Sequence, residues 1–292
     1  MHFCPYDRRV YDEAVAWAES VLGGPITEVV ELSGGMTSTM LALSPASGAP
    51  AVLRLMTNEP WRTHGADLTR RERSAQGALA STTVPAPTSI GIDADGTVTG
   101  VSAHLMSRLP GAPTGTVDAA VVTAMAEMLA RIHDVRPAVA FRPYQSWAWE
   151  AKWVVPAWTC HPDAWQQAFE LLAQEPPAFA PTFLHRDYGH RNLLWSGGQI
   201  SGVVDWVETS TGPAWLDAAH AATNLAVGFG AEPARSFLAA YGALTGSKPD
   251  PYWLVMDAVG FLPPPGKTPM FDSPGELERL DDWLLHVVAS TG

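Results

Sequence analysis

One stretch of the sequence combines side chains that could catalyse group transfer. Residues 183–195 read FLHRDYGHRNLLW and contain the pattern H-x-D-x-x-x-x-N, with Asp187 and Asn192 as its last two specified members. Asp205 follows Asn192 after a further apolar, strand-like run. A loop can place Asp187 to accept or orient a hydroxyl proton, while Asn192 and Asp205 offer the oxygen ligands that Mg²⁺ prefers. The set predicts phosphoryl transfer, which depends mainly on positioning and on neutralising phosphate charge.

The elements expected around this motif are mainly helical. A short strand at 182–184 precedes the loop 185–192, a hairpin is expected across Gly197-Gly198, and a strand at 200–204 leads into Asp205. Amphipathic or apolar patterns with helical spacing follow Pro113. They predict helices at 117–133, 214–228, 232–243, 250–261 and 275–289.

The first 110 residues have a different pattern. A helix is expected at 7–20 and a second at 67–79, where Pro85 and Pro87 prevent its continuation. Short apolar runs separated by turn residues predict five strands. These are expected at 26–32, 39–43, 51–56, 88–92 and 101–107. The prediction is an α+β chain of two lobes: a β-rich lobe with one inserted helix at 1–108 and a mainly helical lobe at 109–292.

The motif and its surroundings resemble the aminoglycoside phosphotransferase-like small-molecule kinases, distant relatives of the protein kinases. The likeness covers nearly the whole chain and is strongest at 183–217, where GPAWLD ends at Asp217. It implies a two-lobed, protein-kinase-like fold that uses ATP or GTP with Mg²⁺. By this resemblance Asp187 is the catalytic base, Asn192 and Asp205 bind the metal, and Asp217 braces the catalytic loop.

The same resemblance assigns a nucleotide-binding role to the strand at 51–56. A kinase carries a phosphate-binding lysine there, but this chain has no lysine before Lys152, so Arg54 is the candidate for the α- and β-phosphates. Glu72, on the inserted helix, is the expected ion-pair partner. The alternatives are a surface charge on an edge strand for Arg54 and an ordinary helix salt bridge for Glu72.

Two further segments of the first lobe are implied to contact the nucleotide. The turn LSGGMTS would cover the phosphates through Ser33, Gly34, Gly35 and Thr37, although by itself it is equally a plain hairpin turn. The segment 104–108 would be the hinge, in which backbone groups of Leu105 and Ser107 bind adenine.

Several other residues have two interpretations. Five tryptophans between 147 and 165 indicate helix packing, with an aromatic wall of a ligand site as the alternative. His190 and Arg191 either reach the transferred phosphate or hold the loop to the body of the protein. His133 is expected to be a packed core or helix-end histidine.

Composition excludes several classes of protein. A net charge of -12 argues against a nucleic-acid-binding surface. Two cysteines cannot build a disulfide framework or a four-thiolate zinc site, and no G-x-S-x-G or H-E-x-x-H motif is present. No run of about 18 apolar residues predicts a membrane span, and the charged N-terminus does not resemble a signal peptide. A cytoplasmic protein with no membrane or nucleic-acid partner is expected.

The sequence predicts transfer of the γ-phosphate to a hydroxyl of a small molecule without identifying that molecule. Residues 151–292 carry 15 acidic against 7 basic residues, which favours an amine-bearing acceptor such as an aminoglycoside, or is simply a solvated acidic surface. The tryptophans favour an apolar acceptor such as a macrolide, and choline, homoserine or a sugar are metabolic alternatives. The other hypothesis is a catalytically silent kinase-like binding protein, which the complete set of Asp187, Asn192 and Asp205 opposes. The oligomeric state is not indicated.

Overall fold

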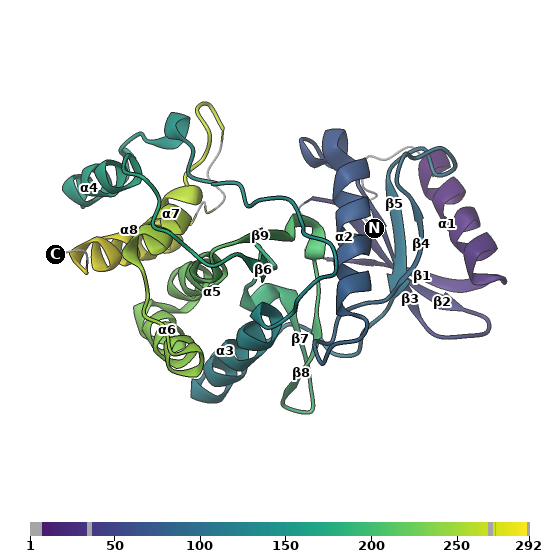
Figure 1. Ribbon diagram of the computed structural model, residues 1–292. Coiled ribbons are helices and arrows are strands. Elements are labelled where there is room, and N and C mark those ends of the chain that lie inside the picture. Colours follow the sequence, from purple (N-terminus) through teal and green to yellow (C-terminus); the bar gives the residue numbers. More distant parts are fainter. Residues whose placement is uncertain (1–7, 34–36, 268–270, 272, 291–292) are drawn as a thin grey trace. The chain divides into compact units, whose positions relative to one another are not determined.

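The computed structural model describes residues 8–33, 37–267, 271 and 273–290 (Figure 1). The chain forms two compact units. The first contains the residues up to Gly111 together with Ser201–Glu208, and the second contains Ala112–Ile200 and the residues from Thr209 onward. The predicted boundary after residue 108 assigned 201–208 to the second lobe, whereas the structure places this segment in the first unit.

The first unit is built on an antiparallel sheet of five strands in the order β1-β2-β3-β5-β4. These strands are β1 (Ile26–Leu32), β2 (Thr39–Pro45), β3 (Ala51–Leu55), β4 (Ser89–Asp93) and β5 (Ala103–Ser107). All five lie within about two residues of the predicted ranges, because turn residues separate them clearly in the sequence. The expected α+β class is confirmed.

Two helices cover the two faces of this sheet, as Figure 1 shows: α1 (Arg8–Leu22) and α2 (Gly65–Leu79). Alternate residues of a strand point to opposite faces. Leu53 and Leu105 therefore pack with Ala14 and Ala18 of α1, while Arg54 and the neighbouring strand's His104 point toward α2. All five residues of β3 are buried, so Arg54 lies on an interior strand.

The second unit is mainly helical. Its helices are α3 (Ala119–His133), α4 (Pro162–Leu172), α5 (Ala214–Phe229), α6 (Ala231–Thr245), α7 (Pro251–Gly260) and α8 (Pro274–Ala289). Helix α5 is the central one: nearly all of its residues are buried, and α6, α7 and α8 pack against it. In the described part of the chain, no helix is both long and apolar enough to cross a membrane.

Short strands hold the segments that carry the motif. β6 (Thr182–Leu184) pairs antiparallel with β9 (Ser210–Gly212), and the loop after β6 leads to β7 (Leu193–Ser196). β8 (Gln199–Val203) then carries the chain from the second unit into the first. Strands β7 and β8 form a two-stranded sheet on either side of Gly197-Gly198, as the expected hairpin requires. Helix α4 and strand β9 were not predicted as separate elements. Strand β9 is too short to show a period, whereas the buried residues of α4 (Ala164, Trp165, Ala168 and Leu172) have the spacing of an amphipathic helix, a signal that the sequence-based prediction missed.

Candidate active site

The loop that follows β6 is held in place by hydrogen bonds to Asp217. This fully buried residue lies in the first turn of α5 and accepts hydrogen bonds from the backbone N–H groups of His185 (2.7 Å) and Arg186 (2.8 Å). His133 donates to the same carboxylate through Nε2 at 3.2 Å. Arg186 has a φ of 73°, a left-handed conformation that a bulky residue adopts only under such restraint. The expected bracing role of Asp217 and the expected core position of His133 are both confirmed.

Asp187, the predicted base, has both carboxylate oxygens occupied by the protein's own donors. Asn192 Nδ2 donates to Oδ2 at 3.0 Å and also to the Asp187 carbonyl at 2.8 Å, and His220 Nε2 donates to Oδ1 at 3.0 Å. The side chain is still 40% exposed. Burial acts to raise the pKa of Asp187, but the hydrogen bond and charge of His220, with smaller effects of His185 and Asn192, lower it. Asp187 is therefore an oriented, ionised carboxylate at neutral pH.

His220 was not among the residues predicted from the sequence. It lies on α5, is buried, and bonds through Nδ1 to Oδ1 of the buried Asp257 of α7 at 2.9 Å. Burial by itself lowers the pKa of His220, but the charges and hydrogen bonds of Asp257 and Asp187 outweigh it and raise this pKa to about 10. The signal that could have identified His220 is its position one helical turn after Asp217, on the side of α5 that faces the loop.

In the first unit, Arg54 lies between two carboxylates. Its Nη1 is 2.6 Å from Asp205 Oδ1, and its Nη2 is 3.4 Å from Glu72 Oε1. Glu72 Oε2 is in turn 2.9 Å from His104 Nδ1, and His104 Nε2 is 2.9 Å from Ser89 Oγ. Arg54 is only 4% exposed, so the alternative of a surface charge is excluded, and the expected ion pair with Glu72 is present.

The environment of Glu72 keeps it ionised. Burial raises its pKa, but the charge of Arg54, the hydrogen bond and charge of His104, and a backbone hydrogen bond from Trp206 lower it. The contact with His104 had not been predicted, because His104 belongs to the expected hinge segment, where only backbone groups were considered.

Asp205 has a φ of 68°, the second non-glycine residue in the left-handed region among those described. Its side chain is one quarter exposed, while the following Trp206 is completely buried and donates from Nε1 to the Val203 carbonyl at 2.9 Å. Strained backbone of this kind is found preferentially at functional sites, where the surroundings hold it in place. The packing of Trp206 restrains the backbone next to Asp205.

Asn192 in the second unit and Asp205 in the first each have an oxygen of the kind that Mg²⁺ prefers. Asn192 donates through its amide nitrogen, which leaves its carbonyl oxygen as a ligand, and Asp205 provides a partly exposed carboxylate. No group of three or more His, Cys, Asp or Glu side chains suited to a metal occurs among the described residues. Mg²⁺ is usually bound by one or two protein oxygens together with substrate phosphates.

The other predicted nucleotide-binding residues are less clearly placed. Gly34 and Gly35 lie outside the described residues, and Ser33 and Thr37 flank them, the first exposed and the second partly buried. The expected role of this turn stays a prediction.

In the expected hinge, the Leu105 side chain is buried in the core, and its strand is paired on both sides, opposite Leu53 and Gly91. The Ser107 N–H donates to the Thr88 carbonyl at 2.9 Å, and the Ser107 hydroxyl accepts from the Thr88 N–H. The adenine contact also stays a prediction, and it excludes the Ser107 N–H as long as this pairing persists.

The structure distinguishes the two interpretations of His190. Its buried ring packs edge-on against Phe229, with centroids 5.0 Å apart. Burial and the charge of Arg191 lower the pKa of His190 to about 4, so the ring is neutral at pH 7. This setting favours a role in holding the loop to α5 over binding of a phosphate, whereas Arg191 is exposed.

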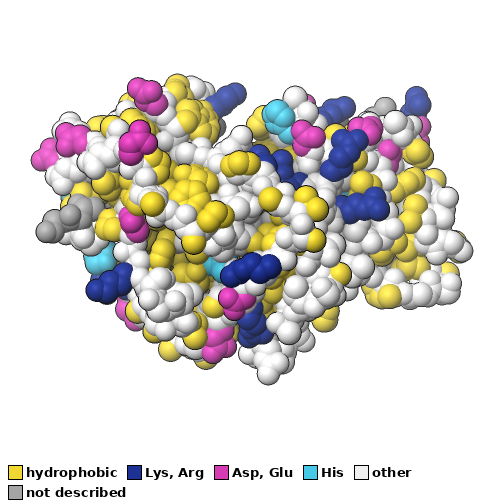
Figure 2. Space-filling model, in the orientation of Figure 1, with side chains coloured by type: hydrophobic (Ala, Val, Ile, Leu, Met, Phe, Trp, Pro, Cys, Tyr) yellow, Lys and Arg dark blue, Asp and Glu magenta, His cyan; other side chains and the backbone are white. Residues whose placement is uncertain are grey.

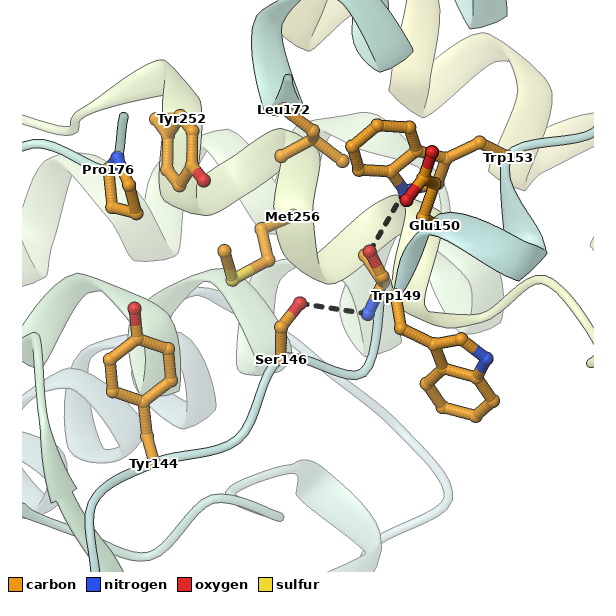
Figure 3. A pocket seen from close by; sticks show the side chains of 10 residues that line it. Tyr144, Ser146, Trp149, Glu150, Trp153, Leu172, Pro176, Tyr252 and Met256 are labelled. Carbon is orange, nitrogen blue, oxygen red and sulfur yellow. Dashed lines mark hydrogen bonds between the residues drawn. The ribbon is translucent and has the colours of Figure 1, made fainter. Parts of the chain in front are cut away.

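A pocket of about 320 Å³ lies in the second unit beside the tryptophan-rich segment (Figure 3). Its lining is mostly aromatic or apolar. The residues are Tyr144, Ser146, Ala148, Trp149, Glu150, Trp153, Leu172, Pro176, Tyr252 and Met256. In Figure 3, Met256 projects between the two tyrosines and Leu172. Hydrogen bonds from the Ala148 N–H to Ser146 Oγ and from Trp153 Nε1 to the Ala148 carbonyl hold the wall of the pocket in place.

The tryptophans do not all have the same role. Trp165 is completely buried and Trp158 packs edge-on against it, which fits the expected helix packing. Trp149 and Trp153 line the pocket instead. Glu150 is the one acidic residue in the lining, and Figure 2 shows the other acidic side chains of this face of the second unit scattered over its outer surface. That distribution fits a solvated acidic surface.

Comparison with known proteins gives the following relations. No curated protein sequence is significantly similar to the chain. Among solved structures, the aminoglycoside phosphotransferase APH(4)-Ia has a TM-score of 0.68 at 18% identity, covering 97% of this chain and 99% of that one. The amicoumacin kinase hAmiN, in complex with AMP-PNP, Ca²⁺ and Ami, has a TM-score of 0.65 at 13% identity over 97% of this chain and 95% of that one. The macrolide 2'-phosphotransferase MphH from Brachybacterium faecium has a TM-score of 0.60 at 16% identity over 85% and 91%.

At these identities the structural likeness establishes a shared fold, the two-lobed kinase-like fold that the sequence predicted. The sequence profile of the phosphotransferase enzyme family matches residues 28–257, which include every residue of the Arg54 and His220 contacts described above. The chain therefore belongs to the phosphotransferase enzyme family.

Proposed function

We propose that the protein transfers the γ-phosphate of ATP or GTP, with Mg²⁺, to a hydroxyl group of a small molecule. The observation that carries the proposal is the setting of Asp187, an ionised carboxylate that is bonded at both oxygens and still 40% exposed. A general base requires this combination of charge, fixed orientation and access to the substrate.

In the proposed step, the acceptor hydroxyl lies against Asp187. As the bond from the acceptor oxygen to the γ-phosphorus forms, the hydroxyl proton passes to the Asp187 carboxylate. The bond from that phosphorus to the bridging oxygen breaks, and the nucleoside diphosphate leaves with the electron pair.

Arg54, and the two metal ligands through the ion that they hold, would neutralise the negative charge of the nucleotide phosphates. Arg54 would bind the α- and β-phosphates, oriented by its ion pair with the buried Glu72. Asn192 and Asp205 would hold Mg²⁺, which when bound supplies neutralisation of the phosphate charge.

We also propose that the pocket beside the tryptophan-rich segment receives an apolar, ring-containing part of the acceptor. Its tyrosine and tryptophan faces suit such a group, and Glu150 suits an amine on it. Helix α7 connects the pocket with the catalytic loop: Tyr252 and Met256 line the pocket, and the next residue, Asp257, bonds to His220. The neighbours named for aminoglycoside, amicoumacin and macrolide substrates make hydroxyl-bearing antibiotics the first acceptors to test.

The test is release of nucleoside diphosphate from Mg-ATP and Mg-GTP with a panel of acceptors. The panel contains aminoglycosides, macrolides, amicoumacin, choline, homoserine and simple sugars, and Asp187→Ala is the control. Acceptor-dependent release that the variant lacks would support the proposal. If the protein shows no release with any acceptor and no Mg²⁺-dependent nucleotide binding, the proposal is contradicted and a silent binding protein is favoured.

A matched pair of variants tests the pocket. Trp153→Leu removes an aromatic face from the lining and should raise the acceptor KM by about 10-fold, the amount expected for one stacking contact. Trp158→Leu, which removes a tryptophan packed against Trp165 outside the pocket, should leave the acceptor KM unchanged. Equal acceptor KM values in the two variants would place the acceptor elsewhere.

A further inference from the structure

We propose that His220 is a positioning residue for phosphoryl transfer: anchored by Asp257, its Nε2–H fixes one oxygen of Asp187 and so directs the carboxylate at the acceptor hydroxyl. The inference rests on the proposed function, in which Asp187 is the base.

The hydrogen bonds require a particular form of the ring. Nε2 is 3.0 Å from Asp187 Oδ1 and Nδ1 is 2.9 Å from Asp257 Oδ1. An ionised carboxylate only accepts hydrogen bonds, so both ring nitrogens must carry a proton and His220 is an imidazolium. The raised pKa of this histidine agrees with that form. A doubly protonated ring has no lone pair for a proton, which leaves Asp187 as the group that receives it.

The ring is locked by packing as well as by its bonds. Phe261 stacks on it with centroids 5.4 Å apart and planes at 6°, and Trp147 contacts it edge-on at 5.3 Å. Asn224 donates from Nδ2 to the His220 carbonyl at 2.9 Å, and the same Nδ2 lies 3.1 Å from His220 Nε2, which in the imidazolium form has no lone pair to accept from it. The side chain is 5% exposed, so neither rotation of the ring nor water at its nitrogens replaces the contact with Asp187.

Within the described part of the chain, the Asp257 side chain makes its hydrogen bond to His220. Its carboxylate is 1% exposed, it bonds to His220 through Oδ1, and Oδ2 has no hydrogen-bond partner among the described residues. A buried carboxylate is tolerated only when its charge is paired, and the cation that pairs it is His220. The arrangement places an imidazolium, whose positive charge is shared by both ring nitrogens, next to the partly exposed Asp187.

The contact bears on the reaction more than on the shape of the loop. The loop backbone is already held by Asp217 through the N–H groups of His185 and Arg186. His220 bonds to the Asp187 side chain and not to the loop backbone. Among the described residues, its loss would leave the Asn192 amide as the donor to that carboxylate and would free the side chain to rotate. Misplacement of a reacting group by about 1 Å can lower a rate by about 100-fold.

Two substitutions of His220 test the hydrogen bonds of the two ring nitrogens separately. His220→Gln places an amide N–H near Nε2 and keeps a donor to Asp187, whereas His220→Asn places it near Nδ1 and keeps only the bond to Asp257. We expect His220→Asn to lower kcat by about 10- to 100-fold, with the KM values for nucleotide and acceptor changed less than about 3-fold, and His220→Gln to recover most of the loss.

A second pair serves if the histidine variants fail to fold. Asp257→Asn removes the buried partner of His220, and Asp281→Asn makes the same change at a buried aspartate of α8. Asp281 accepts hydrogen bonds from Thr159, Cys160 and Trp165, which all lie outside the loop 185–192. Both should lower the melting temperature, but only Asp257→Asn should lower kcat. Equal kcat in these two variants, a kcat for His220→Asn within 2-fold of the wild type, or a change confined to KM would overturn the proposal.

Asp187→Ala in the same assays distinguishes this proposal from the proposed function. Full activity of Asp187→Ala would refute Asp187 as the base. An inactive Asp187→Ala beside a fully active, folded His220→Asn would refute the positioning role alone.

Discussion

In each unit a buried acid anchors a cation, and the cation holds a second, more exposed aspartate. In the first unit the order is Glu72, Arg54, Asp205, and in the second it is Asp257, His220, Asp187. We refer to these as the Arg54 cluster and the His220 cluster. The exposed aspartate is 25% accessible in the Arg54 cluster and 40% in the His220 cluster.

The two clusters differ in what their cation must do during turnover. Arg54 bonds to Asp205 at 2.6 Å. In the proposed function this bond must break when the nucleotide binds, because Asp205 then binds Mg²⁺ and Arg54 binds phosphate. His220 keeps the same partners throughout, because the proposed base needs its orientation in every cycle. An arginine, charged at every working pH, suits the first task, and a histidine charged by its neighbours suits the second. The Arg54 cluster should therefore control nucleotide binding and the His220 cluster should control kcat.

The largest expected effect is that of Asp187→Ala on kcat. Removing the base should lower kcat by about 100- to 10,000-fold, the usual contribution of a positioned general base. The nucleotide KM should change little, since Asp187 is not proposed to hold phosphate. Steady-state kinetics with the best acceptor measures both, and a loss confined to nucleotide KM would reverse the assignment of the two clusters.

Asp205→Ala should act on nucleotide binding. At a Mg-ATP concentration of about 100 times Kd, binding stabilises the wild type by about 2.7 kcal/mol, or about 5–10 °C in melting temperature. Asp205→Ala should lose this stabilisation. Asp187→Ala should retain it, and omission of Mg²⁺ should abolish it in both proteins with an intact Asp205. Unchanged stabilisation of Asp205→Ala by Mg-ATP would contradict the metal assignment.

Arg54→Lys changes the geometry of the first cation without removing its charge. A lysine lacks the planar fork that reaches Asp205 and Glu72 together, so the nucleotide KM should rise by about 10-fold, equivalent to one charge-assisted hydrogen bond. The acceptor KM and the pH dependence of kcat should stay the same. An effect limited to the acceptor KM would show that Arg54 does not contact nucleotide.

The exposed member of each cluster was predictable from sequence, and the buried cation was predictable in only one. Asp187, Asn192 and Asp205 have a fixed spacing along a loop and strand, and Arg54 is marked by the absence of any early lysine. His220 and Asp257 lie on two helices and meet 37 positions apart. No local pattern brings them together, because an isolated His or Asp on an apolar helix carries no period of its own.

The same distinction applies to the fold. The sheet of the first unit follows from local runs and turns, so its strands were predicted closely. The return of Ser201–Glu208 to the first unit depends on long-range contacts, such as the hydrogen bond from Arg71 to the Val207 carbonyl. A domain boundary predicted from local composition cannot detect such a return, because the return depends on contacts between residues that are far apart in the sequence.

The smallest expected effect is on the pH dependence of stability, and it concerns the His220 cluster alone. The pKa of His220 is raised from an ordinary value of 6.5 to about 10 in the folded protein, where Asp187 and Asp257 face it and Asn224, Trp147 and Phe261 complete its surroundings. A raised folded pKa gives stability that is fully present below pH 6.5 and is lost as the pH rises through about 10. The wild-type melting temperature should therefore fall by several degrees between pH 6.5 and 10 relative to that of His220→Gln, which has no titrating group at this position. Arg54 does not titrate in this range, so the cation of the Arg54 cluster adds nothing to this slope. Parallel pH profiles of the wild type and His220→Gln would show that His220 is neutral in the folded protein, and Asp187 would then lack the charged donor that the His220 cluster provides.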